Sequence, residues 1–460
     1  MLFNSFEFIF IFLPLTLFIF YLLVNKNQKN LAVFGLAALS LAFYGYWNFR
    51  YVFLILASIA ANYATGLLLS KLGSKKILVA GIAFNLLLLG YYKYCNFFAA
   101  SIAQLFHLNI NTAPLNITLP LAISFFTFTQ IAYIVDVYRN REIRYDPVSY
   151  SLFVLFFPHL IAGPIVYHRE IIPQFQDAKT FKVNYSNIST GILLFFIGLF
   201  KKVMVADYFS PHVAAVFDQA ESPTFFEAWA GTLSYAMQIY FDFSGYTDMA
   251  LGLARLFNIR MPHNFDSPYK SDSIIEFWRR WHITLSRFLR DYLYIPLGGN
   301  RRGMARKYLN LMITMLLGGL WHGAGWTFVV WGGLHGIYLC INHRCRAMNI
   351  KMPRLAAKTL TFTAVTVAWI FFRARDLKSA LKVLSGCLGL NGFDLHPRYA
   401  TKEEVFFILL ALAAVNFLPN SQHLAGIFKP SARWLAFAVS LALVSLTMID
   451  NPSEFLYFQF

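Results

Sequence analysis

Residues 308–341 read YLNLMITMLLGGLWHGAGWTFVVWGGLHGIYLCI, a run that contains no Asp, Glu, Lys or Arg. About 20 consecutive apolar residues span a bilayer as a helix. A run of this length therefore holds two helices, which we expect at 308–320 and 328–341. Apolar runs of the same kind recur along the chain. The sequence thus predicts an all-α, polytopic integral membrane protein.

The composition supports the same class. Of the 460 residues, 58% are hydrophobic and only 13% are charged, whereas a soluble domain is about 45–50% apolar and about 25% charged. The balance excludes intrinsic disorder, which requires low hydrophobicity. The formal net charge of +17 is typical of basic loops held on the cytoplasmic side of a membrane. We expect no nucleic-acid partner, because no RNA- or DNA-binding module is visible.

We expect about 11–13 transmembrane or re-entrant helices in one membrane domain that covers residues 1–460. Residues 1–24 lack the basic n-region and the cleavage site of a signal peptide, so we expect a retained first helix there. The predicted spans are 6–24, 31–46, 51–69, 77–105, 115–137, 150–166, 187–205, 225–256, 308–320, 328–341, 360–372, 405–418 and 434–448.

Residues 270–307 form the most basic segment, which we assign to the cytoplasmic side as an interfacial helix and loop. Apolar residues recur at helical spacing over 273–294, and Arg279, His282 and Arg290 stand three or four residues apart or at multiples of that spacing. This pattern predicts one amphipathic helix with a cationic face. Anchoring in lipid headgroups is the simpler interpretation of such a helix, but His282 adds little to anchoring and can exchange protons near neutral pH.

Two histidines, His322 and His335, lie inside the uncharged run. An ionisable residue at membrane depth is costly and is therefore a functional candidate. The alternative is a packed imidazole that hydrogen-bonds a backbone carbonyl. We favour that alternative for His335 and a functional role for His322, which glycines flank on both sides.

Asp242 and Asp248 are carboxylates in another mainly apolar run, 229–257. Buried carboxylates need partners. We favour a structural pairing with Arg255 or with arginines of 279–290 over a role in lining a polar tunnel. His159 lies between Pro158 and Pro164, which break a span and suggest a re-entrant helix; a turn histidine is the simpler interpretation.

Several chemistries find no support in the sequence. There is no phosphate-binding G-x-x-x-x-G-K-[ST] motif and no G-x-S-x-G nucleophile motif. The four cysteines form no C-x-x-C pair, so we expect neither a metal site nor a disulfide framework. An enzyme of this composition would depend on histidine as its base.

Taken together, five stretches of the sequence resemble the membrane-bound O-acyltransferase superfamily, and the resemblance covers nearly the whole chain. It is strongest to the bacterial alginate and peptidoglycan O-acetylation membrane proteins, with the teichoic-acid D-alanylation protein more distant. The stretches are FWRRWH (277–282), RDYLYIPLGGNRR (290–302), LWHG (320–323), YFDFSGYTD (240–248) and PHLIAGP (158–164).

This resemblance implies a ring of helices around a central tunnel, with His322 as the catalytic residue and His282 beside it. It implies acetyl-CoA as the donor substrate without a tightly bound cofactor, a periplasmic partner of the SGNH-hydrolase type, and the bacterial inner membrane as the location. We expect His335, Asp242, Asp248 and Trp321 to support the site. The arginines expected to meet the phosphates of the donor are Arg279, Arg280, Arg287, Arg290, Arg301 and Arg302.

The expected function is transfer of acetyl from cytoplasmic acetyl-CoA across the membrane for O-acetylation of a periplasmic polysaccharide, peptidoglycan or alginate. We lean slightly towards peptidoglycan, because the chain is compact. A D-alanyl transfer protein would share the histidines but would need a carrier protein. A transporter or flippase would share the many spans but should show two repeated halves, and none is visible.

Overall fold

The computed structural model describes residues 1–107, 115, 117–161, 163–394, 398–449 and 456. Every regular element in this part of the chain is a helix. The α-helices are α1 (Leu13–Asn25), α2 (Lys29–Trp47), α3 (Arg50–Leu72), α4 (Lys75–Leu89), α5 (Cys95–Leu105), α6 (Ile123–Arg139), α7 (Pro147–Leu155), α8 (Phe157–Leu160), α9 (His168–Gln176), α10 (Tyr185–Phe200), α11 (Asp207–Ala214), α12 (Phe225–Leu256), α13 (Ile274–Arg280), α14 (Ile283–Leu289), α15 (Gly303–His322), α16 (Trp326–Ala347), α17 (Arg354–Arg373), α18 (Leu377–Cys387), α19 (Lys402–Phe417), α20 (Ser421–Ile427) and α21 (Ala432–Leu446).

Short π-helical and 3-10 segments lie between several of these helices. The π-helical turns are η1 (Phe8–Phe12), η2 (Gly90–Tyr94), η3 (Lys201–Ala206), η4 (Ala215–Gln219) and η6 (Arg290–Tyr294), and η5 (Pro268–Lys270) is a 3-10 turn. Isolated π turns inside helices are frequent at functional sites. Two of them, η2 and η6, are in contact with the helices that carry the candidate histidines.

The prediction of an all-helical, multi-pass membrane protein is confirmed. Within the described residues, six helical runs are long and apolar enough to cross a membrane, or seven if the bent pair α19–α20 is one span. Other predicted spans are shorter or more polar helices, and the predicted span 150–166 is broken into α7 and α8. Residue 116 of span 115–137 and residue 162 of span 150–166 lie outside the described residues.

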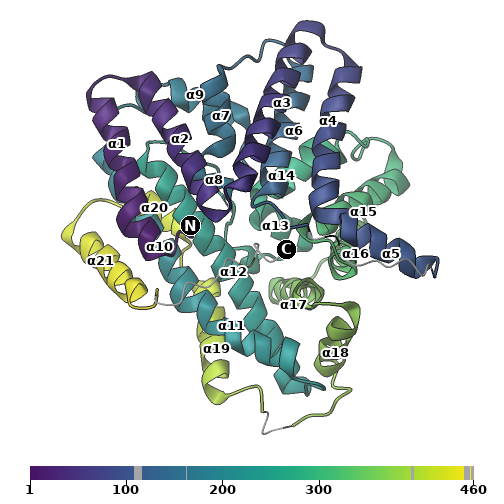
Figure 1. Cartoon of the computed structure of the whole chain (residues 1–460). Coiled ribbons are helices and arrows are strands. Elements are labelled where there is room, and N and C mark those ends of the chain that lie inside the picture. The colour runs from purple at the N-terminus through teal and green to yellow at the C-terminus, as the bar shows by residue number, and fades with distance from the viewer. Residues whose placement is uncertain (108–114, 116, 162, 395–397, 450–455, 457–460) are drawn as a thin grey trace.

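Helix α12 occupies the centre of the molecule, where it contacts α10, α11, α17, α18 and α19 (Figure 1). Two pairs of glycines let α10 and α12 approach closely, because each glycine has the other helix's backbone carbonyl where a Cβ would stand. Small residues at such crossings are typical of helix packing in membranes, where van der Waals contact replaces the hydrophobic effect between helices. The pairs are Gly191 with Gly252 and Gly198 with Gly245.

Helices α15 and α16 form a hairpin, as the opening run predicts. Its open end is basic, and there the Lys307 ammonium lies 3.1 Å from Nδ1 of His343. Near its closed end, a Cβ on Gly319 would overlap the carbonyl oxygen of Phe328, so glycine is required for the two helices to meet. The turn Gly323–Gly325 then connects them directly after His322.

The predicted single amphipathic helix over 273–294 is wrong. The chain forms α13, breaks at Trp281 and His282, and resumes as α14 and η6. His282 has φ 42° and ψ 53°, in the left-handed region. Long-range backbone hydrogen bonds stabilise this break. The N–H of Asp266 donates to the carbonyl oxygen of Arg280, and the N–H of Ile283 donates to the carbonyl oxygen of Asn264. The predicted cationic face of a continuous helix therefore does not exist.

Candidate active site

His322 is the last residue of α15 and is buried, with 3% of its surface exposed. Its imidazole lies among aromatic rings, with the ring centroids of Trp321 and Trp331 at 5.0 Å and that of Phe372 at 5.2 Å. These rings come from α15, α16 and α17, so the catalytic candidate stands where three helices meet. Such a surrounding excludes water and strengthens electrostatic interactions inside it.

His282 lies beside His322, with 6.3 Å between the two ring centroids. Trp321 is close to both imidazoles, at 6.2 Å from His282 and 5.0 Å from His322. The break between α13 and α14 brings about this juxtaposition, because it turns His282 inward, where it is fully buried. The two histidines that the sequence singled out are therefore brought together by the tertiary structure.

Asn264 holds His282 in place. Its Oδ1 lies 3.0 Å from Nδ1 of His282 and also accepts hydrogen bonds from the backbone N–H and the hydroxyl of Thr284. Because this oxygen only accepts, Nδ1 of His282 carries the proton, and the neutral ring has its lone pair on Nε2. Thr284 in turn accepts a hydrogen bond from the backbone N–H of Ile165, which ties the site to the segment after Pro164.

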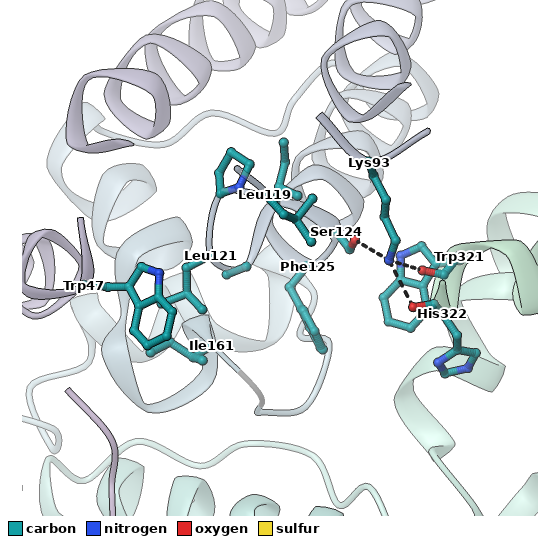
Figure 2. Close-up of a pocket in the computed structure, with 12 residues that line it drawn as sticks. Trp47, Lys93, Leu119, Leu121, Ser124, Phe125, Ile161, Trp321 and His322 are labelled. Carbon is teal, nitrogen blue, oxygen red and sulfur yellow. Dashed lines mark hydrogen bonds between the residues drawn. The ribbon is translucent and has the colours of Figure 1, made fainter. Parts of the chain in front are cut away.

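A small cavity of about 80 Å³ reaches Trp321 and His322 from the side of α2, α6 and the segment 119–122 (Figure 2). Lys93 reaches into its wall and hydrogen-bonds the backbone carbonyls of Trp321 and His322. In the same view the imidazole of His322 points away from the ammonium group of Lys93 (Figure 2).

His335 is fully buried one turn of helix beyond Trp331. Its Nδ1 accepts a hydrogen bond from Nε1 of Trp278 at 3.3 Å, and the ring centroid of Trp331 lies 4.8 Å away. His335 is therefore packed in the aromatic layer next to His322, but its hydrogen-bond partner is the indole of Trp278 and not the backbone carbonyl that we expected. His159 is buried in the short helix α8, with Nε2 2.8 Å from the carbonyl oxygen of Phe153.

Asp242 and Asp248 pair with lysines, and the predicted arginine partners are wrong. Lys202 lies 2.6 Å from Asp242 and Lys201 lies 2.7 Å from Asp248. The π turn η3 allows the consecutive lysines to reach both carboxylates on α12, whereas Arg255 bonds to Asn187. These ion pairs join η3 to α12, which fits the structural role that we favoured.

The six predicted substrate-binding arginines divide into two groups. Three are engaged in ion pairs, which reduces their availability for an anionic ligand: Arg280 with Glu276, Arg287 with Glu170 and Arg290 with Asp291. The other three form no ion pair with any residue in the described part of the chain: Arg279, Arg301 and Arg302. Arg301 and Arg302 line a pocket of about 410 Å³ together with residues 294–296 and 298–300.

Sequence reasoning missed Asn264 and Lys93. Lys93 has a clear signal, since it is the only charged residue between Ile77 and Leu105. Asn264 has no such signal, because it stands in a polar loop among other candidates. Among the described residues, no group of three His, Cys, Asp or Glu side chains is placed to hold a metal ion.

The chain belongs to the membrane-bound O-acyltransferase family, whose model matches residues 139–375. It is accordingly an acyltransferase of the membrane. The chain is 41% identical to the peptidoglycan O-acetyltransferase of Helicobacter pylori, with 100% of this chain and 98% of that protein covered. It is 39% identical to the probable alginate O-acetylase AlgI of Azotobacter vinelandii, over 90% of this chain and 84% of that protein. The teichoic acid D-alanyltransferase of Bacillus subtilis is 28% identical over 60% of this chain and 75% of that protein.

Proposed function

We propose that this protein takes acetyl from cytoplasmic acetyl-CoA and passes it across the inner membrane for O-acetylation of a periplasmic polysaccharide. The observation that carries the proposal is the buried pair His282–His322, with ring centroids 6.3 Å apart, in a member of an acyltransferase family. The full-length relatives act on peptidoglycan or alginate by name. An imidazole is the general base that this transfer needs.

In the proposed reaction, His322 takes the proton from an acceptor hydroxyl. The hydroxyl oxygen attacks the acetyl carbonyl carbon, the carbon–sulfur bond of the thioester breaks, and CoA leaves as a thiolate. The thiolate takes the proton back from the imidazolium of His322, so the enzyme returns to its starting state. Burial among aromatic rings keeps water from intercepting the thioester.

His282 has a narrower range of roles than His322. Since Nδ1–H is directed at Asn264, a neutral His282 presents a lone pair at Nε2 and binds a substrate donor. It stabilises an oxyanion only after taking up a proton. We propose that His282 orients the reactants next to His322, with Asn264 setting its tautomer.

The donor is proposed to enter at the basic end of the α15–α16 hairpin. Arg301 and Arg302 line a pocket there and form no ion pair within the described residues, so their guanidinium groups suit phosphate binding. The basic character of this segment favours the cytoplasmic side.

Peptidoglycan is the acceptor that we favour, with a secreted partner of the SGNH-hydrolase type completing the transfer. The support is the match to the Helicobacter pylori enzyme over nearly the full length of both chains. Alginate is the second candidate, supported by relatives of almost equal identity. D-alanyl transfer has weaker support, since that relative matches only 60% of the chain.

The test is replacement of His322 by Ala, with ester-bound acetate of the cell wall and of exopolysaccharide measured after mild alkaline release. We expect the acetate to fall to background at normal protein level. Purified protein is then given radiolabelled acetyl-CoA, and release of the CoA thiol is followed. Unchanged wall acetate in the variant would refute the role of His322, and activity only with an added carrier protein would favour D-alanyl transfer.

A further inference from the structure

Lys93 is a partly buried charge that the proposed reaction does not use. It lies in the helical run Lys75–Leu105, which is long and apolar enough to cross a membrane. A charged residue at such a position is costly and calls for a function. Lys93 stands in the π turn η2 between α4 and α5, and such turns in helices are frequent at functional sites.

The ammonium group of Lys93 makes three hydrogen bonds. Nζ donates to the carbonyl oxygen of Trp321 at 2.6 Å, to that of His322 at 3.1 Å and to the hydroxyl of Ser124 at 3.3 Å (Figure 2). The next residue, Tyr94, donates its hydroxyl proton to the carbonyl oxygen of Leu320 at 2.8 Å. Two side chains of one turn thus hold three consecutive carbonyls of α15.

These carbonyls are the ones that a helix cannot satisfy by itself. The last four carbonyl groups of an α-helix lack partners within the helix. In α15 the first of the four, that of Gly319, accepts from the N–H of Gly323, and η2 supplies the partners of the other three. A cation at this end also matches the negative pole of the helix dipole. The end of α15 that carries His322 is therefore held from outside the hairpin.

We propose that Lys93 is a positioning residue for His322. An ammonium group has three N–H donors, and here all three are engaged, so Lys93 does not also donate to the reacting acetyl carbonyl. Its action is to fix the final peptide unit of α15 and with it the Cα–Cβ bond that aims the imidazole. Ser124, on α6, accepts the third hydrogen bond of the ammonium and also lines the cavity. The inference rests on the proposed role of His322.

The test compares Lys93→Met, which keeps the length of the side chain without its donors, with Lys93→Arg, which keeps the charge. Lys382, on α18, offers a matched control. Its ammonium also donates to two backbone carbonyls, those of Phe217 in η4 and of Ala220 directly after η4. Each purified variant is assayed for kcat and KM with acetyl-CoA, and its thermal unfolding in detergent is recorded. His322→Ala is measured alongside.

We expect Lys93→Met to lower kcat at least tenfold with KM for acetyl-CoA within twofold of the parent protein. Lys93→Arg should recover part of that loss, and Lys382→Met should lower the unfolding temperature with kcat unchanged. Parent-like kcat in Lys93→Met, together with an inactive His322→Ala, overturns the positioning role alone. Equal losses of kcat in Lys93→Met and Lys382→Met also overturn it, because they reflect general destabilisation. An active His322→Ala overturns the proposed function instead.

Discussion

Asn264→Ala removes the one oxygen that holds His282. In the structure this oxygen accepts three hydrogen bonds, from Nδ1 of His282 and from the N–H and hydroxyl of Thr284. All three groups are buried. The variant leaves the imidazole N–H without its acceptor and frees the ring to turn about its side-chain bonds, which should displace it from the position beside His322.

The expected loss of kcat/KM follows from the free-energy cost of leaving one buried N–H donor without an acceptor. Leaving such a group unsatisfied costs about 1–3 kcal/mol. If the reaction must restore the correct orientation of His282, this cost raises the barrier by the same amount. Since each 1.36 kcal/mol is tenfold in rate, kcat/KM should fall about 5- to 150-fold.

The assay is release of the CoA thiol from acetyl-CoA by purified protein, with Thr284→Val as the matched variant. Thr284→Val removes the hydroxyl bonds to Asn264 and Ile165 but leaves the His282–Asn264 bond intact. We expect a clearly smaller loss of kcat/KM than in Asn264→Ala. Equal losses in the two variants would refute the reasoning, since the effect would then come from the loop and not from His282.

Three further variants test other parts of the structure. Gly319→Ala should push the two helices of the hairpin apart, and overpacking of this kind costs about 1–3 kcal/mol, measurable as a lower unfolding temperature in detergent. Asp242→Asn removes one of two carboxylates that pair with the buried Lys202, while Asp207, 2.8 Å from the same ammonium, stays as its partner. The loss should therefore stay below the cost of about 3–5 kcal/mol expected when a buried pair is broken completely, and the double variant with Asp207→Asn should approach that range. Replacing Arg301 and Arg302 by Gln should raise KM for acetyl-CoA while kcat stays near the parent value, and the difference should shrink at high salt because exposed charges are screened.

Part of the site could be predicted because its signals are local. His322 and His335 stand out as ionisable residues in an uncharged run. Lys93 carries the same signal in its own run, although its target lies 229 residues away in the chain. The surroundings of the two histidines differ in the structure. The ring of His322 lies 6.3 Å from that of His282, whereas His335 accepts a hydrogen bond from Trp278.

The predicted helix over 273–294 shows why the rest could not be predicted. Its apolar spacing is helical, yet hydrogen bonds with residues 264–266 stabilise a break at Trp281–His282. Periodicity reports the preference of a segment in isolation, and tertiary contacts override it. The same holds for Asp242 and Asp248, whose lysine partners depend on how η3 winds against α12.

The sequence by itself determined the class of protein, because apolar runs long enough to span a bilayer leave the chain no water-soluble alternative. It also determined which ionisable residues lie in apolar runs, where burial is costly and a structural or functional role is expected. Only the tertiary structure decided which of them meet. His282 reaches His322 through a backbone break, and η2 supplies the partners for three of the last carbonyls of α15. Buried polar groups must find partners, and in a helical bundle those partners come from segments distant in the chain.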